Sequence, residues 1–141
     1  MNYATDFPSI KDQVSPQEWQ ARLELAACYR LVDVYGMTDL VYNHITARVP
    51  GEDDVVLLNL YGLLYKEITA SSLVKIHVDG EILWKPDTDY DINKSGYVIH
   101  GAIHKARPGK LAFINLYPNW VPTNAIGMSF AMSMFSTPFR S

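Results

Sequence analysis

Between residues 43 and 84 the sequence breaks into short β-rich pieces separated by turn residues, and this pattern restricts the fold more than any other feature. One of the turns, Asp79-Gly80, predicts a β-hairpin. The expected strands cover residues 45–49, 55–59, 73–78, 81–84 and 111–116. Helices are expected on both sides of this stretch, so the order of elements predicts an α/β domain with a central, mainly antiparallel sheet.

The first helix has a well-marked start and end. Ser15 can cap it, Pro16 suits the first helical position because its missing N–H is not needed there, and Glu18 completes a capping box. Gly36 provides a left-handed end. Apolar residues at helical spacing predict one apolar face, formed by Trp19, Leu23, Ala27, Leu31 and Val34.

Two more helices are expected in the second half of the chain. Ser95 can cap a helix that runs to Ala106. Arg107-Pro108 ends this helix because the residue before a proline avoids the α region. A last helix is expected at 123–135, although Gly127 and several serines weaken it.

Length and composition describe a single soluble domain. The chain has 141 residues, the usual size of one domain, and 48% apolar residues suffice for a core. A net charge of −3 argues against nucleic acid or an anionic membrane as the partner. Cys28 is the single cysteine, which excludes an internal disulfide and fits a reducing compartment. The N-terminus shows no secretion signal, so we expect a cytoplasmic protein.

Charge is unevenly distributed along the chain. Residues 1–91 carry a net charge of −8, whereas residues 92–141 carry five basic and no acidic residues. Residues 111–139 contain no charged side chain, which raises the question of a membrane span. Prolines interrupt this run, and its longest proline-free piece, 123–137, is shorter than the ~20 apolar residues that a span requires. We therefore expect no membrane segment.

The four histidines differ in what their positions predict. His100 and His104 are four residues apart on a predicted helix and could chelate one metal ion, but two ligands do not complete a Zn²⁺ site. The alternative, which we favour, is that one ring faces the sheet and the other lies near the helix end. His44 follows a turn at the start of a strand, where polar residues often line pockets. His77 is expected to face solvent from its strand.

Small hydroxyl residues mark two candidate anion sites. Ser71-Ser72 with Thr69, and Ser95-Gly96 at a predicted helix start, could donate hydrogen bonds to an anion. Local caps and turns are the more common use of each group taken alone. The sequence has no P-loop, dinucleotide-binding, nucleophile-elbow or C-x-x-C motif.

Four longer segments follow one another in an order that carries a resemblance. They read GMTDL, YNHITARVPG, YGLLYKEITASSLVKI and GYVIHGAIHKARP, and they begin at Gly36, Tyr42, Tyr61 and Gly96. Together they resemble the class II aldolase/adducin family, and most closely its adducin-like branch. The resemblance covers about residues 16–108.

The resemblance implies a three-layer α/β/α fold, self-association as a tetramer and chemistry on sugar phosphates. Intact family members use a divalent metal ion, generally Zn²⁺, as a Lewis acid for cleavage or epimerisation. Binding of a phosphorylated small molecule is implied for four positions, which are His44, Tyr61, Gly62 and Ser95.

Departures from the family pattern argue against catalysis by this chain. Gly96 stands where the aldolases carry a catalytic Glu. Asn115 and Tyr117 stand where the family has an H-x-H pair of metal ligands, and no histidine follows His104. The resemblance therefore implies an impaired enzyme with no catalytic residue, no metal site and no cofactor of its own. The alternatives are a non-catalytic adducin-like interaction module and the inactive remnant of a longer enzyme.

The resemblance and the charge pattern together divide the chain into three parts. We expect a polar N-terminal arm at 1–14, the N-terminal part of a class II aldolase/adducin-like domain at 15–108, and a divergent tail at 109–141. The C-terminal part of the family fold would then be incomplete, through truncation, a frame shift or divergence.

Overall fold

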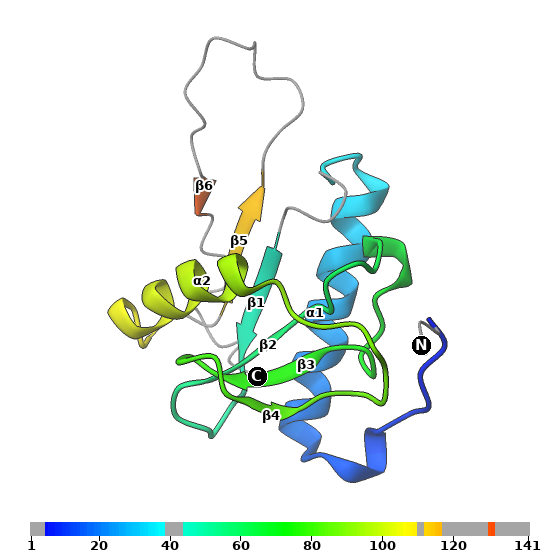
Figure 1. Ribbon diagram of the computed structural model, residues 1–141, viewed down its shortest axis with the longest axis horizontal. Coiled ribbons are helices and arrows are strands. Elements are labelled where there is room, and N and C mark those ends of the chain that lie inside the picture. Colours follow the sequence, from blue (N-terminus) through cyan, green and yellow to red (C-terminus); the bar gives the residue numbers. More distant parts are fainter. Residues whose placement is uncertain (1–4, 39–43, 110–111, 117–129, 132–141) are drawn as a thin grey trace, which may run out of the picture.

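A computed structural model describes residues 5–38, 44–109, 112–116 and 130–131 of the chain. Three layers make up the fold: helix α1 (Pro16–Val34), a six-stranded sheet and helix α2 (Lys94–Ala106). Figure 1 shows the two helices on opposite faces of the sheet. The α/β/α architecture expected from the sequence is therefore confirmed.

Every pair of neighbouring strands in the sheet is antiparallel. The strands are β1 (His44–Arg48), β2 (Val55–Leu58), β3 (Val74–His77), β4 (Ile82–Trp84), β5 (Ala112–Leu116) and β6 (Phe130–Ala131). Their order across the sheet is β4-β3-β2-β1-β5-β6. The consecutive strands β1 to β4 therefore lie side by side, and β5 pairs with the other side of β1. Two short 3₁₀ helices, Lys11–Gln13 and Tyr65–Glu67, complete the described elements.

One expected helix disagrees with this topology. The helix predicted at 123–135 is wrong at Phe130–Ala131, which form β6 and pair with β5. Pairing with the exposed edge of β5 satisfies the backbone groups of these two residues, and the glycine and serines nearby gave the helix little intrinsic support. The rest of that predicted helix lies outside the described residues.

Helix α1 begins as its sequence predicts. The Ser15 side chain accepts a hydrogen bond from the Glu18 N–H at 3.1 Å, and Pro16 occupies the first helical position. Gly36 has a φ of +65°, the left-handed end that was expected. The capping box is different, because the Glu18 carboxylate binds Arg22 and Lys75 at 2.8 Å each. Among the described residues, no helix combines the length and hydropathy needed to cross a bilayer.

The apolar face predicted for α1 is wrong. Leu23, Leu31 and Val34 are 42%, 54% and 76% exposed, so the predicted stripe faces away from the sheet. The buried side contains Glu18, Ala21, Arg22, Leu25, Ala26, Tyr29 and Val32. Two charged residues on this side make it look polar in sequence, although they neutralise each other by pairing inside the protein.

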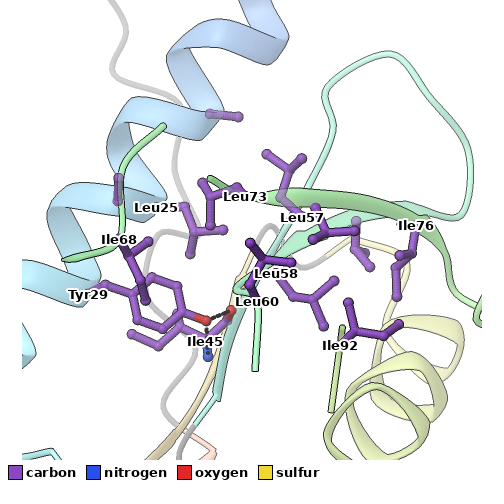
Figure 2. Close-up of a cluster of buried hydrophobic side chains, with 14 of the residues drawn as sticks. Leu25, Tyr29, Ile45, Leu57, Leu58, Leu60, Ile68, Leu73, Ile76 and Ile92 are labelled. Atoms are coloured by element: carbon purple, nitrogen blue, oxygen red, sulfur yellow. Dashed lines mark hydrogen bonds between the residues drawn. The ribbon is translucent and has the colours of Figure 1, made fainter. Parts of the chain in front are cut away.

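A single cluster of buried apolar side chains joins α1 to the sheet (Figure 2). Leu25 and Tyr29 of α1 pack there with Leu57, Leu58 and side chains from the loops. All four residues of β2 are buried, which is what a strand with a helical layer on each face requires. In the N-terminal segment Ile10 is also buried, and its N–H donates to the Ser71 hydroxyl.

Tyr29 fixes the start of β1 through its hydroxyl (Figure 2). The hydroxyl oxygen accepts from the Ile45 N–H at 2.9 Å and lies 2.5 Å from the Ile45 carbonyl oxygen and 2.9 Å from Asn59 Oδ1. The side chain is fully buried, and burial raises the pKa of Tyr29, so the phenol stays protonated.

We expect Tyr29→Phe to lower the free energy of unfolding by about 1–3 kcal/mol, because the buried Ile45 N–H loses its partner. Urea denaturation measures the change. Tyr35→Phe is the matched control, since Tyr35 is 71% exposed and should tolerate the same deletion. Equal stability of the two variants would contradict the role given to the Tyr29 hydroxyl.

Candidate functional site

The candidate site lies where the start of β1, the turn after β2 and the first turn of α2 meet. Its closest contact joins His44 of β1 to Gly96 of α2, two residues far apart in sequence. A Cβ atom placed on Gly96 would lie 2.5 Å from His44 Cδ2, 2.8 Å from Nε2 and 3.0 Å from Cγ. His44 is 4% exposed, so its ring is enclosed on nearly all sides. Position 96 therefore accepts glycine and excludes a side chain as long as His44 holds this position.

Asn93, and not Ser95, caps α2, so the predicted cap is wrong by two residues. Asn93 Oδ1 accepts from the Ser95 N–H at 3.1 Å, the Ser95 hydroxyl at 2.7 Å and the Gly96 N–H at 3.4 Å. Asparagine is as good a cap as serine, and it precedes the helix at the right position. The N–H and the hydroxyl of Ser95, which the sequence suggested as donors to an anion, therefore both donate to Asn93 instead.

The turn after β2 is tied to the segment that leads into α2. The Tyr61 N–H donates to the Asp91 carbonyl at 2.7 Å, two residues before the cap. Gly62 has a φ of +105°, and the ring of Tyr90 lies against it, so glycine is required on both counts. The Tyr61 side chain is 42% exposed. Tyr61 is therefore partly accessible to solvent, whereas His44 is buried.

Asn59 sets the tautomer of His44. Its Nδ2 donates to the Leu60 carbonyl, which leaves Oδ1 as the atom facing His44 Nδ1 at 3.3 Å. Because a carboxamide oxygen only accepts, the proton is on Nδ1 and His44 Nε2 carries a lone pair. This Nε2 is buried and has no hydrogen-bond partner in the part of the chain that the structure describes. Burial lowers the pKa of His44, with Asn59 opposing the shift, so the ring is neutral at pH 7.

Two more histidines extend the site along the same face of β1. Thr46 Oγ1 lies 2.8 Å from His100 Nδ1 and 2.9 Å from His104 Nε2, and the rings of His44 and His100 meet edge to face at 6.3 Å. Burial, helped by His44, lowers the pKa of His100 to about 4. Burial, helped by Arg48 and His100, lowers that of His104 to about 3. All three rings are therefore uncharged at neutral pH.

The structure agrees with the arrangement that we favoured for the helical histidine pair: His100 faces the sheet, and His104 lies in the last turn of α2, where it is buried against the sheet as well. Their i, i+4 spacing did predict a shared face. The Thr46 hydroxyl was missed, and the signal for it was the alternation of β1, which places residues 44 and 46 on one face of the sheet.

The second group of hydroxyl residues serves the local turn. The Thr69 hydroxyl accepts from the Ser72 N–H at 3.1 Å, and the Ser72 hydroxyl accepts from the Thr69 N–H at 2.9 Å. Ser71 binds the N-terminal segment through Ile10. These residues lie by the core and the arm, and they are not part of the site around His44.

A family model described as Class II Aldolase and Adducin N-terminal domain matches residues 23–124, which is most of the chain. The chain belongs to the class II aldolase and adducin family. The resemblance drawn from four sequence segments is thereby confirmed, and the matched range includes β5.

Members of both branches of the class II aldolase and adducin family are similar to this chain. Alpha-adducin of Rattus norvegicus is 44% identical over 96 residues, which cover 68% of this chain and 13% of that protein. The crystal structure of an aldolase II superfamily protein from Pseudomonas syringae superposes with a TM-score of 0.75 at 49% identity, covering 79% of this chain and 45% of that one. L-fuculose 1-phosphate aldolase from Glaciozyma antarctica gives 0.68 at 27% identity, covering 82% and 46%. The chain thus spans less than half the length of these relatives.

The metal ion of the family's enzymes can be tested against the residues of this chain. In the described ranges no group of three or more His, Cys, Asp or Glu side chains could hold a metal ion. His100 and His104 direct one nitrogen each at the same threonine hydroxyl instead of at a common cation. The sequence has one further histidine besides the three of the site, and His77 lies beside Asp79 on the surface. These residues do not fit the three-imidazole site that the family resemblance implies.

Proposed function

We propose that this chain is a non-catalytic, adducin-like member of the class II aldolase and adducin family, whose own residues do not carry out metal-assisted aldol cleavage. The contact between His44 and Gly96 carries the proposal. By resemblance, the aldolases have their catalytic Glu at position 96, and here the neutral ring of His44 is packed where that side chain would begin.

The geometric requirement of general acid–base catalysis supports this proposal. A catalytic base must come within hydrogen-bond reach of the proton that it abstracts. A carboxylate cannot be added at position 96 without displacing His44, which Asn59 and Gly96 hold on two sides. The atom that remains near the position, His44 Nε2, is buried. The site therefore lacks an accessible base at the place where the family enzymes use one.

The donor set supports the same proposal. Asn115 and Tyr117 occupy the positions where the resemblance implies two imidazole ligands, and an amide and a phenol are poor substitutes for imidazole toward Zn²⁺.

Binding of a phosphorylated small molecule stays a separate prediction for His44, Tyr61, Gly62 and Ser95. In the present geometry the Ser95 hydroxyl and N–H both bind Asn93. An anion at the start of α2 would have to displace the Asn93 side chain first. The helix end itself favours negative charge, so this exchange is chemically reasonable.

Calorimetric titration with Zn²⁺ and an assay of L-fuculose 1-phosphate cleavage test the non-catalytic proposal together. We expect no stoichiometric Zn²⁺ binding at micromolar affinity and no cleavage, because the donor set and the base are missing. The Glaciozyma antarctica aldolase serves as the active control. The His77→Gln variant is the control for Zn²⁺ binding at the surface, because it removes the imidazole beside Asp79. Micromolar binding at one ion per chain that survives in His77→Gln, or measurable cleavage, would refute the proposal.

A further inference from the structure

Helix α2 presents an apolar and basic surface to solvent. Val98 and Ile99 are 59% and 52% exposed, and the helix contains no acidic residue. Lys94 and Lys105 are exposed as well. Positions 94, 98 and 105 share one side of the helix, because they are four and seven residues apart. Lys94, Val98 and Lys105 therefore form a basic patch with an aliphatic side chain between two lysines.

The basic patch borders the turn between β3 and β4. Tyr97 packs against the main apolar cluster, and a Cβ atom placed on Gly80 of the turn would lie 2.5 Å from its ring. In the last turn of α2, Lys105 forms an ion pair with Asp79. The position of the patch relative to β3 and β4 is therefore fixed at both ends.

The strand after this turn carries the opposite charge. Trp84 of β4 faces α1, because the Arg22 guanidinium lies over its ring at 4.9 Å. Side chains alternate along a strand, so Leu83 and Glu81 point to the other side of the sheet, where α2 lies. Leu83 is 44% exposed, and both Glu81 and Asp79 are exposed. Asp79, Glu81 and Leu83 therefore form an acidic patch beside the basic one.

Each patch has one charge without a partner of its own. Asp79 and Lys105 bind each other across the border between the patches. Lys94 and Glu81 form no ion pair within the residues that the structure describes. Opposite charges of this kind attract across an interface and fix its orientation. The basic patch is thus complementary to an acidic patch such as the one beside it.

We propose that the basic and acidic patches form one self-complementary surface through which two copies of the chain pair about a twofold axis. The basic patch of each copy lies on the acidic patch of the other. Val98 then meets Leu83 of the partner subunit, and Lys94 meets Glu81 of the partner subunit, so that each contact occurs twice. The inference goes beyond the proposed function and does not depend on it, because neither patch lines the candidate site.

A second copy fits this surface better than a nucleic acid or an anionic membrane does. Both of these present negative charge only, and the acidic patch would repel it. The partner must offer acidic and basic groups side by side in the same arrangement. A second copy of the chain meets this requirement through its own two patches.

The small size of the two patches predicts a weak dimer. Interfaces at the low end of the size range are typical of transient complexes, and salt screens exposed charges. We expect a Kd on the order of 10–100 µM at low salt, and a value at least about fivefold higher at about 0.5 M salt. Sedimentation velocity of the whole chain over a series from about 5 to about 500 µM measures both values.

Charge reversal tests the contact between the patches. Lys94→Glu and Glu81→Lys should each raise the Kd by about tenfold or more, because like charges then face each other twice. Both positions are exposed, and an acidic residue suits the first turn of a helix, so the variants should stay folded. Lys66→Glu is the matched control, since it reverses an exposed cation outside both patches and should leave the Kd unchanged.

Mixing the two reversed variants distinguishes this dimer from other modes of self-association. In a 1:1 mixture of Lys94→Glu and Glu81→Lys, one contact joins the two reversed charges and the other joins the two native ones. The mixture should therefore form a heterodimer with about the Kd of the unmodified chain, although each variant alone dimerises poorly. The double variant of one chain should dimerise equally well, because both of its contacts join opposite charges.

The apolar part of the contact is tested separately. Val98→Ser should raise the Kd by about tenfold, because it removes a buried aliphatic side chain from each of the two contacts. Val34→Ser is its control, since Val34 is 76% exposed on α1 and lies outside both patches. A monomer throughout the concentration series, equal Kd values for Lys94→Glu and Lys66→Glu, or no gain on mixing would overturn the dimer. A tetramer that neither charge reversal weakens would place self-association on another surface and would also overturn it.

Discussion

Replacing Arg22 by alanine is expected to lower the free energy of unfolding by about 3–5 kcal/mol, because it breaks a buried ion pair and the hydrogen bonds of the guanidinium. Arg22 is fully buried on the inner side of α1, where its Nε donates to Glu18 at 2.8 Å. Its Nη1 donates to the carbonyls of Ala70 and Leu73 at 3.2 Å and 2.7 Å. The alanine variant would deprive both carbonyls of this donor and leave the Glu18 carboxylate with one of its two cations, Lys75.

Two comparisons isolate the cause of this loss. Lys66→Ala removes an exposed cation and should change stability by less than about 0.5 kcal/mol. Glu18→Gln in the Arg22→Ala background should restore part of the stability, since it removes the buried carboxylate that has lost one of its two cations, and Lys75 retains Glu52 at 2.6 Å. Urea denaturation of the four proteins measures both effects. If Arg22→Ala were as stable as Lys66→Ala, the buried pair would not hold α1 to the sheet.

Restoring the aldolase carboxylate through Gly96→Glu is expected to destabilise the protein by about 3 kcal/mol or more, the upper range of overpacking costs. The new Cβ would lie 2.5 Å from the buried ring of His44, so the ring or the helix would have to shift. The charge alone would have the opposite effect, because an acidic residue in the first turn of α2 favours the helix. Loss of stability would therefore report the steric conflict.

His44→Asn provides the matched rescue of Gly96→Glu. The resemblance implies an asparagine at this position in the aldolases. Asparagine lacks His44 Nε2, one of the three atoms within 3.0 Å of the new Cβ, and its smaller amide can turn away from position 96 more easily than the imidazole ring. We expect the double variant to be more stable than Gly96→Glu alone, with a coupling of about 1–3 kcal/mol in a double-mutant cycle. Gly109→Glu is the control, since nothing lies within 4 Å of a Cβ there. Additive effects of the two substitutions would show that His44 and position 96 do not compete for space.

The sequence predicted the sheet better than it predicted how the helices pack on it. Turns and alternation located β1 to β4 within about two residues, because these signals are local. The buried face of α1 could not be found in this way. Glu18 and Arg22 lie inside only because each has a partner that the fold supplies, and hydrophobic spacing alone selects the exposed stripe that includes Leu31.

The candidate site was predicted in its parts but not in its contacts. Position 44 and the start of α2 were both identified, yet their mutual exclusion of side chains appears only when β1 and α2 are packed together. The same holds for Thr46, which joins two histidines of a helix more than fifty residues away. Sequence spacing reports what lies on one element, and these features depend on how two elements are arranged.

The short strand β4 has a consequence for encounters between folded copies of the chain. It forms one margin of the sheet, where Ile82 and Leu83 are 41% and 44% exposed, and such a margin could recruit a strand from another molecule. Its pairing with β3 shifts register at Lys75/Ile76, and Pro86, the second residue after the strand, has no N–H to donate. A strand from another molecule would meet three residues of irregular backbone, one further residue and then a proline, which is too short a template for intermolecular sheet growth.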